Sequence, residues 1–240
     1  MYEVILKDFL MHVDGKFDQL SDEIKSECDR NELLVAENEQ LKSKVIKLED
    51  TLVNTRDQVD AASQYNRRDN IKIIGVPYEK DEDLDKKVKD IMKHCDVELK
   101  DEDVSVQHRL HTGNDDPDKP PSIILRLTRR NVKTQIFNNR KLTVTKPDAP
   151  YAKAQIFEDV TPLRSRIMFS LRNRLKENGR DKVYRFVWSR EGRIYCRTEE
   201  ESQLKPQPKP KVVNRPDDLK KLGYTAEEID DIVNNKNRRN

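Results

Sequence analysis

Residues 33–52 read Leu-Leu-Val-Ala-Glu-Asn-Glu-Gln-Leu-Lys-Ser-Lys-Val-Ile-Lys-Leu-Glu-Asp-Thr-Leu. Apolar side chains recur here in alternating steps of three and four residues, and the positions between them are mostly polar or charged. The pattern extends through residues 6–62, where the polar Glu27 and Asn31 occupy two seam positions without changing the register. This stretch contains no proline and one glycine, Gly15. A seam sustained over about eight heptads is typical of a coiled coil. We therefore expect one long helix that joins copies of the chain.

The number of strands in this coil is left open by its seam. Asn38 at a core position favours two strands, whereas residues 44–49, Lys-Val-Ile-Lys-Leu-Glu, resemble a trimer-specifying motif with lysine where arginine is usual. We expect a parallel homo-oligomer, with a trimer favoured over a dimer; the alternative is a helix packed on its own globular domain. The expected oligomerisation residues are Leu20, Ile24, Leu34, Asn38, Leu41, Val45, Leu48, Leu52 and Val59.

Composition limits what the rest of the chain can be. Only 34% of the 240 residues are hydrophobic, 38% are charged, and the mean hydropathy is −0.96. These values favour small domains beside a solvated helix over one large core. No apolar run approaches the roughly 20 residues of a membrane span, and the N-terminal residues lack a secretory pattern. We therefore expect no membrane partner. Cys28, Cys95 and Cys196 are odd in number and far apart in the sequence, so we expect them to be reduced thiols.

Residues 66–161 show strand and helix patterns in the order β-α-β-β-α-β. Strands are expected at 71–77, 104–110, 122–127 and 154–157, helices at 81–95 and 129–140, and a polar loop at 113–121. This order is the one used by RNA-recognition-motif domains. The first and third strands lack the aromatic residues on which such domains stack bases, so we expect phosphate contacts instead. The candidates are Arg67, Arg68, Lys72, Arg109, Arg126, Arg129, Arg130 and Lys133.

Residues 162–215 concentrate the positive charge, with 15 basic and 6 acidic side chains. Thr161-Pro162 predicts the start of a helix that ends at Gly179. Strands are expected at 183–188 and 193–197, joined by a turn at 189–192. An uncompensated cationic block favours binding to a polyanion.

The aromatic residues of the first of these strands alternate with Arg185. We expect Phe186 and Trp188 in the core, while Tyr184 and Tyr195 could stack a base beside an arginine. The candidate nucleic-acid contacts of this block are Arg164, Arg166, Arg172, Tyr184 and Arg185.

The pattern divides the chain into five segments. Thr225-Ala226-Glu227-Glu228 looks like a capping box that opens a short final helix. The segments are a coiled coil at 1–65, a domain like the RNA-recognition motif at 66–161, a small basic α/β domain at 162–203, a Pro/Lys linker at 204–215 and a short helical segment at 216–240. The expected fold class is therefore α+β.

Three segments together carry a family resemblance: residues 67–77 (RRDNIKIIGVP), 121–127 (PSIILRL) and 159–166 (DVTPLRSR). In their order after a coiled coil, they resemble the first-open-reading-frame protein of LINE-type non-LTR retrotransposons. The resemblance implies a trimeric coil that carries an RNA-recognition-motif domain and a small C-terminal domain. It also implies coating of the element's own transcript and nucleic-acid chaperone activity. The RNA contacts that it implies are Arg68, Arg109, Arg126, Arg130, Arg164, Arg166 and Tyr184.

The expected function is thus that of a non-catalytic, oligomeric protein that binds single-stranded RNA, and also single-stranded DNA, largely without sequence preference. We expect it in a cytoplasmic ribonucleoprotein, with nuclear access left open, and with no cofactor. No Walker loop, HExxH or GxSxG motif is present, which argues against the enzymes that use them. A zinc site at Cys95, His108 and His111 is disfavoured because the two histidines would point to opposite faces of a strand. The alternative is a coiled-coil scaffold whose α/β domain binds protein.

Overall fold

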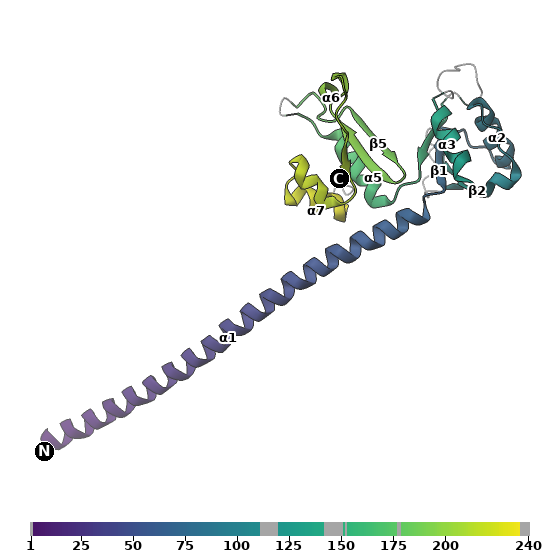
Figure 1. Cartoon of the computed structure of the whole chain (residues 1–240). Coiled ribbons are helices and arrows are strands. Elements are labelled where there is room, and N and C mark those ends of the chain that lie inside the picture. The colour runs from purple at the N-terminus through teal and green to yellow at the C-terminus, as the bar shows by residue number, and fades with distance from the viewer. Residues whose placement is uncertain (1, 111–119, 142–150, 152, 177–178, 236–240) are drawn as a thin grey trace. The chain divides into compact units, whose positions relative to one another are not determined.

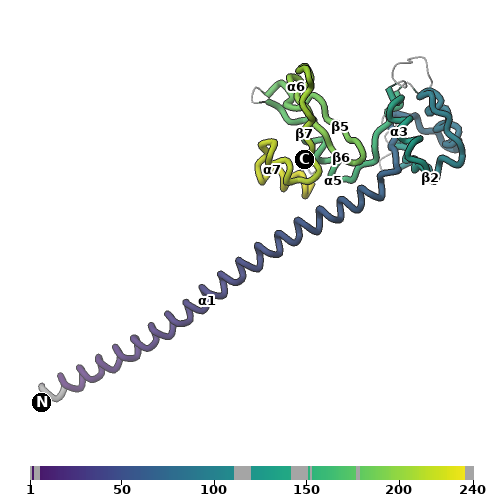
Figure 2. Tube along the Cα trace, viewed as in Figure 1, coloured from purple at the N-terminus to yellow at the C-terminus, as the bar shows by residue number. Residues whose placement is uncertain are grey.

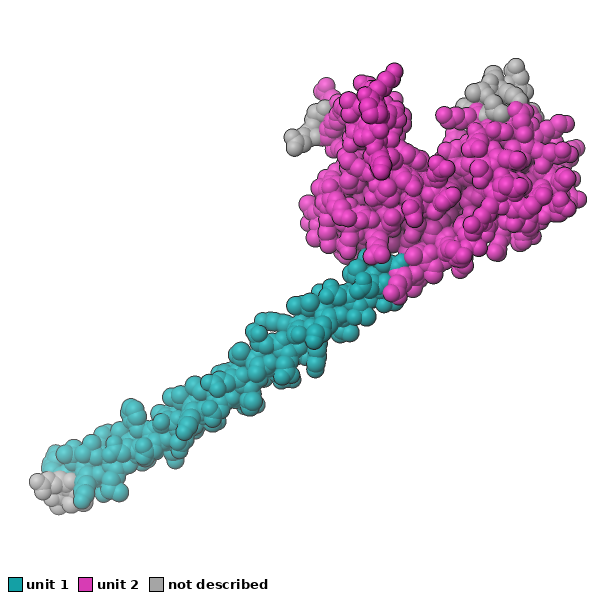
Figure 3. Space-filling model, in the orientation of Figure 1, with its two compact units in different colours: residues 1–57 teal, residues 58–240 magenta. Residues whose placement is uncertain are grey.

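The computed structural model describes residues 2–110, 120–141, 151, 153–176 and 179–235. The chain is an α+β protein in which one long N-terminal helix precedes two antiparallel sheets (Figure 1; Cα trace in Figure 2). It divides into two compact units, Met1–Asp57 and Gln58–Asn240 (Figure 3). In the part of the chain that is described, no helix combines the length and apolar character needed to cross a membrane.

Helix α1 runs without interruption over Tyr2–Asn66, which confirms the predicted long N-terminal helix. The seam side chains are exposed along it, from Leu34 at 49% to Leu52 at 72%. Exposed apolar side chains at this spacing form a stripe that water does not solvate favourably. The helix by itself therefore leaves its seam unburied.

The first sheet contains four strands in the spatial order β2-β3-β1-β4, and every neighbouring pair is antiparallel. Helices α2, Leu84–His94, and α3, Arg130–Asn139, follow β1 and β3 along the chain, and the 3₁₀ turn η1, Asp101–Asp103, precedes β2. The strands are β1 (Asn70–Ile74), β2 (Val104–Leu110), β3 (Ser122–Leu127) and β4 (Gln155–Glu158). These elements lie within about three residues of the predicted ranges, as boundary assignments generally do. Residues 113–119 of the predicted polar loop lie outside the described residues.

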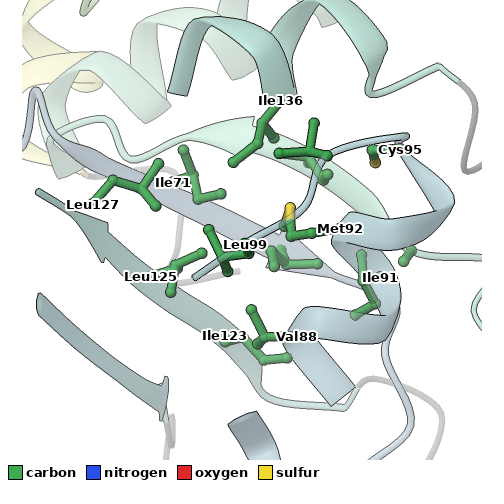
Figure 4. Close-up of a cluster of buried hydrophobic side chains, with 14 of the residues drawn as sticks. Ile71, Val88, Ile91, Met92, Cys95, Leu99, Ile123, Leu125, Leu127 and Ile136 are labelled. Carbon is green, nitrogen blue, oxygen red and sulfur yellow. The ribbon is translucent and has the colours of Figure 1, made fainter. Parts of the chain in front are cut away.

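The first core lies between this sheet and its helices. Val88 and Met92 of α2 meet Ile71 of β1 and Ile123 of β3 in one buried cluster (Figure 4). Asp83 is the N-cap of helix α2, and its side chain accepts a hydrogen bond from the backbone N–H of Lys86. Each such aliphatic side chain contributes about 1.5–3 kcal/mol when it is fully buried, so this cluster is the main stabilising element of the sheet.

A second core lies between the three-stranded sheet β5-β6-β7 and two helices. Ile167 and Leu171 of helix α5 pack with Ile194 and Cys196 of the central strand β6. The elements are α5 (Pro162–Asn173), β5 (Phe186–Arg190), β6 (Arg193–Arg197), α6 (Glu199–Gln203), β7 (Lys211–Val213), η2 (Pro216–Leu222) and α7 (Ala226–Asn234).

Both predicted helix starts in this region are confirmed. The Thr161 hydroxyl accepts from the backbone N–H of Arg164, with Pro162 in the first turn. Thr225 and Glu228 form a reciprocal capping box at the start of α7. Such caps satisfy backbone donors that the first helical turn leaves open, which explains why these two positions could be found by sequence pattern.

Three predicted boundaries in this region differ from the structure. Helix α5 ends at Asn173 rather than at Gly179, because Arg174 is extended and Leu175 bridges to Lys182. Strand β5 begins three residues later than predicted, at Phe186. Lys211–Val213, inside the predicted Pro/Lys linker, adds a third strand beside β6.

The prediction that Phe186 and Trp188 belong to the core is wrong. In the β5–β6 hairpin Trp188 pairs with Tyr195. The residues on either side of Tyr195 along β6, Ile194 and Cys196, are buried and point to the opposite face. Partners across a sheet share a face, so the aromatic pair lies on the outer face. Phe186 shares that face and is 45% exposed.

Candidate nucleic-acid interface

A cleft of about 780 Å³ lies within the second unit. Its walls come from the last turns of α1, from α3, from the end of β4 and from the β5–β6 hairpin. Among the described residues that line it, two are acidic, Glu158 and Glu191. Seven are basic: Arg68, Arg130, Lys133, Arg140, Arg164, Arg190 and Arg193. A concave surface lined mostly by one sign of charge raises the local concentration of ligands of the opposite sign.

The hairpin wall of the cleft is held by a carboxylate at the end of β4. The two Glu158 oxygens accept hydrogen bonds from the backbone N–H groups of Glu191 and Gly192, at 2.6 and 3.0 Å. Both turn residues have positive φ, +51° and +76°, as a two-residue type I′ turn requires. Arg190 and Arg193 flank this turn and face each other across it. The turn geometry therefore places two arginine residues opposite each other at the edge of the cleft.

The last turns of α1 hold the connection between β4 and α5. The Gln64 side chain donates to the Asp159 carbonyl at 3.0 Å and accepts from the Thr161 N–H at 2.9 Å. The Arg164 Nε bonds Asp60 at 2.8 Å, and its Nη1 bonds the Gly192 carbonyl at 2.6 Å. Arg164 is only 9% exposed, so it lines the cleft as a structural group that positions the hairpin.

Arg109 has no hydrogen-bond donor left for a ligand. Its Nε and Nη2 bond the two oxygens of Glu82 at 2.7 and 2.9 Å. Its remaining donors reach three backbone carbonyls, those of Val76, Pro77 and Pro121. Since a guanidinium has five N–H donors, this set saturates it. The charge of Arg109 therefore stabilises the first domain instead of facing a phosphate.

Three other predicted arginines are held by partners within the fold. Arg166 donates to the carbonyls of Ile232 and Val233 at the end of α7, at 2.7 and 2.9 Å. The Nη1 of Arg67 donates to both carboxylate oxygens of Asp159, at 2.9 and 3.0 Å. Arg129 pairs with the buried Asp103. Cations near a helix C-terminus and ion pairs with buried carboxylates are structural uses of arginine.

Lys133 and Arg68 lie together on the α3 side of the cleft. The Lys133 ammonium donates to the Arg68 carbonyl and lies 3.8 Å from Glu158. Burial lowers the pKa of Lys133, and the nearby carboxylates, Glu158 foremost, act against that shift. The Arg68 guanidinium lies 3.8 Å from the centre of the Tyr65 ring. Lys133 is therefore largely engaged inside the wall, while Arg68 is only partly covered.

The remaining predicted contacts divide by exposure. Arg130 is exposed in the cleft, and its closest acidic group is Asp69 at 3.5 Å. Arg126, Arg172 and Arg185 are exposed outside the cleft lining. Tyr184 is only 4% exposed, and burial raises its pKa to about 12. Its ring packs in the second core, where it could stack on a base only if that core opened.

Arg190, Arg193 and Trp188 are cleft residues that the sequence prediction missed. The predicted four-residue turn at 189–192 included Arg190 and made no use of Arg193. The signal that could have located them is Glu191-Gly192, because an X-Gly pair between alternating residues indicates a two-residue hairpin. With that register, both arginines fall on the same face as Trp188.

Among the described residues, no cluster of three or more His, Cys, Asp or Glu side chains could hold a zinc ion. Cys95 is fully buried at the end of α2, whereas His108 is exposed on β2. His111 lies outside the described residues. No protein-family model matches the chain, and no curated protein matches it.

Proposed function

We propose that this chain is an oligomeric protein that binds single-stranded RNA, and also single-stranded DNA, largely without sequence preference. The observation that carries the proposal is the cleft, whose lining contains more basic than acidic residues and includes the exposed Arg130, Arg190 and Arg193. In this proposal the protein acts as a nucleic-acid chaperone in a cytoplasmic ribonucleoprotein, like the LINE-type retrotransposon proteins that the sequence resembles.

The chemistry of the cleft suits phosphate groups. Arg130, Arg190 and Arg193 are exposed around it, and arginine donors match phosphate oxygens in bidentate geometry. Phosphate contacts position a strand without identifying its bases. Several such contacts of modest strength would hold strands close together while still allowing them to exchange, which is what chaperone activity needs.

The first sheet supports the same proposal through its topology. Its strand order, β2-β3-β1-β4, with a helix after β1 and another after β3, is compatible with the split βαβ arrangement that RNA-recognition motifs use. On the face away from the core, β1 carries the partly buried Lys72 and Ile74, and β3 carries the buried Ile124 and the exposed Arg126. The only Phe, Tyr or Trp ring beside them on this face in the described strands is the half-buried Phe157 of β4, which pairs with Lys72. Because β1 and β3 themselves lack rings, this sheet would contribute mainly cations.

The exposed seam of α1 supports assembly into a parallel coiled coil, with a trimer favoured over a dimer. Leu41, Leu48 and Leu52 are each at least half exposed in the single chain, and pairing with equivalent helices would bury them. Joining two or three weak binding sites raises avidity by about 100- to 10,000-fold. Oligomerisation would therefore give a modest cationic cleft a useful affinity.

The first test removes two cleft cations from the full chain. Arg190→Ala with Arg193→Ala should weaken binding to an oligo(U) RNA by about 25-fold at 0.1 M salt, because two phosphate contacts on a single strand contribute a salt slope of about 1.4. Fluorescence anisotropy across salt concentrations measures both quantities. Lys220→Ala with Lys221→Ala is the control, since these exposed lysines pair with Asp217 and Asp218 away from the cleft lining. Equal binding by both variants would overturn the proposal and favour a scaffold.

A second test concerns oligomerisation. Leu41→Asp with Leu48→Asp should convert the assembly into monomers and weaken RNA binding by about 100-fold, since intramolecular contacts are lost. Ser43→Asp introduces the same carboxylate off the seam and should keep the assembly. Sedimentation equilibrium gives the mass directly. A monomeric unmodified chain at micromolar concentration would contradict the coiled coil.

A further inference from the structure

The outer face of the β5–β6 hairpin combines aromatic rings and arginines. Phe186 pairs with Arg197, Trp188 with Tyr195, and Arg190 with Arg193. Cross-strand partners share a face, so this outer face presents three rings and three guanidinium groups: Phe186, Trp188, Arg190, Arg193, Tyr195 and Arg197. The inner face is occupied by the second core, through Ile194 and Cys196.

Two of the three rings on this outer face, those of Trp188 and Tyr195, are stacked on each other. The Trp188 and Tyr195 rings lie 5.6 Å apart, centre to centre, with planes 14° apart. Both are half-buried, and Phe186 at the far end is 45% exposed. Large rings are costly to leave in contact with water. Aligned and partly exposed rings of this kind form a surface on which a further flat, apolar group can pack.

The arginines set the charge that such a ligand must carry. Arg190 and Arg193 are exposed at the turn end of the outer face. Arg197, at the other end, is held by Gln207 and the Pro208 carbonyl at 2.7 and 2.9 Å. An apolar protein segment laid over the rings would cover the two turn arginines without giving them anions, which is unfavourable. A strand of nucleotides supplies flat bases and phosphates together.

We propose that the outer face of β5–β6 is a stacking platform for unpaired nucleobases. It rests on the proposed function, because Trp188, Arg190 and Arg193 also line the cleft, and one strand would pass from the cleft onto the platform. Base pairs in a duplex already stack on each other and hide their faces. The platform therefore makes the protein prefer single strands to duplexes, whereas the cleft cations alone would accept both.

The chain carries its own reporter for this contact, since Trp188 is its only tryptophan. Titration of the full chain with oligo(U) RNA should quench Trp188 fluorescence, because a stacked base contacts the indole. An RNA duplex of the same length and an abasic oligonucleotide should bind through phosphates, seen as increased anisotropy, without quenching. If the duplex and the abasic oligonucleotide quench Trp188 fluorescence as strongly as the single strand does, the platform is overturned.

Variants separate stacking from charge. Trp188→Leu and Phe186→Leu should each lower single-strand affinity by about tenfold, the effect of one lost base stack, with the salt slope unchanged. Phe169→Leu is the matched control, since Phe169 is a 70% exposed ring on α5, outside the hairpin. An unchanged thermal midpoint shows that each variant is folded.

The outcomes distinguish the two proposals. If the unmodified chain binds single strands with a steep salt slope, but Trp188→Leu and Phe186→Leu bind as it does, the platform is overturned and the proposed function stands. If the chain binds no polynucleotide at low salt, the proposed function fails and the platform fails with it. A tenfold loss without a change of salt slope supports both.

Discussion

The two sheets of this chain differ in what their free faces carry. Each has one face buried in a core. In the four-stranded sheet, the face away from the core carries the partly buried Lys72 and Ile74, the buried Ile124, the exposed Arg126 and one half-buried phenyl ring, Phe157 of β4. In the three-stranded sheet, β5 and β6 carry three rings and three arginines there. The smaller sheet therefore has the larger share of rings and arginines on its outer face.

The arginines of the two sheets differ in the same sense. Arg109 of β2 turns toward the helices and is saturated by internal acceptors, whereas Arg190 and Arg193 turn outward. Alternation along a strand decides which face a side chain joins, so a shift of one residue in register would exchange these roles. Strand parity, more than domain topology, decides which of these arginines are exposed.

The largest expected effect on stability comes from replacing the internally bonded Arg109. Arg109→Met should lower the free energy of unfolding by about 3 kcal/mol, because it leaves a buried carboxylate with one partner fewer. Glu82 would keep its 2.9 Å contact with Lys87, which places the loss at the lower end of that range. Equilibrium unfolding in guanidinium chloride measures this loss of stability. Arg193→Met, on the outward face, should change stability by less than about 0.5 kcal/mol; equal losses would remove the distinction between the two sheets.

The hairpin turn gives the next largest effect. Gly192→Ala should destabilise the chain by about 2 kcal/mol, since positive φ strains a side chain and the new Cβ would lie 2.6 Å from the Gln64 Cγ. Gly179→Ala is the control: its φ is also positive, but nothing lies within 4 Å of its Cβ position. Thermal unfolding of both variants isolates the packing contribution. Identical midpoints would mean that Gln64 moves aside without cost.

The smallest expected effect is on the reactivity of Cys196, which lies on the inner face of the second sheet. Burial raises the pKa of Cys196 from 9.0 to about 11, so at pH 8 only about 0.1% of it is the reactive thiolate. Iodoacetamide should therefore modify the exposed Cys28 and spare Cys196, as mass spectrometry of peptides can show. Rapid alkylation of Cys196 in the folded chain would contradict its burial.

The raised pKa of the Cys196 thiol also predicts how the free energy of unfolding changes with pH. Its folded pKa lies above the unfolded value, so the unfolded chain loses this proton first as pH rises above about 9. The contribution of Cys196 burial is therefore present below pH 9 and declines between about pH 9 and pH 11. Comparing unfolding midpoints of the unmodified chain and Cys196→Ala across that range tests the sign.

Local pattern predicted much of the fold. Strands β2, β3 and β6 match their predicted residues because each alternates or is apolar between clear turn signals. The end of α5 could not be predicted, since its apolar spacing continues to Leu175 while the backbone leaves the helix after Asn173. There a bridge to Lys182 replaces the helical hydrogen bonds, and a nonlocal pairing of that kind leaves no periodic signal.

The candidate site was less predictable than the fold. Charge density singled out residues 162–215 as a candidate binding block, yet two of its predicted contacts, Arg164 and Arg166, are engaged by Asp60 and by the end of α7. Arginine donors look alike in sequence whether they meet a carboxylate, a carbonyl or a ligand. Only the tertiary structure reveals which guanidinium groups are already satisfied.

The contacts of Asp60 and Gln64 determine where the globular part of the chain can be cut. A fragment that starts at residue 66, where the helical pattern ends, would remove both side chains. The Thr161 N–H would lose its acceptor, and the buried Arg164 would lose its carboxylate. A recombinant piece intended for crystallisation or NMR should therefore begin no later than Gln58, where the second unit starts.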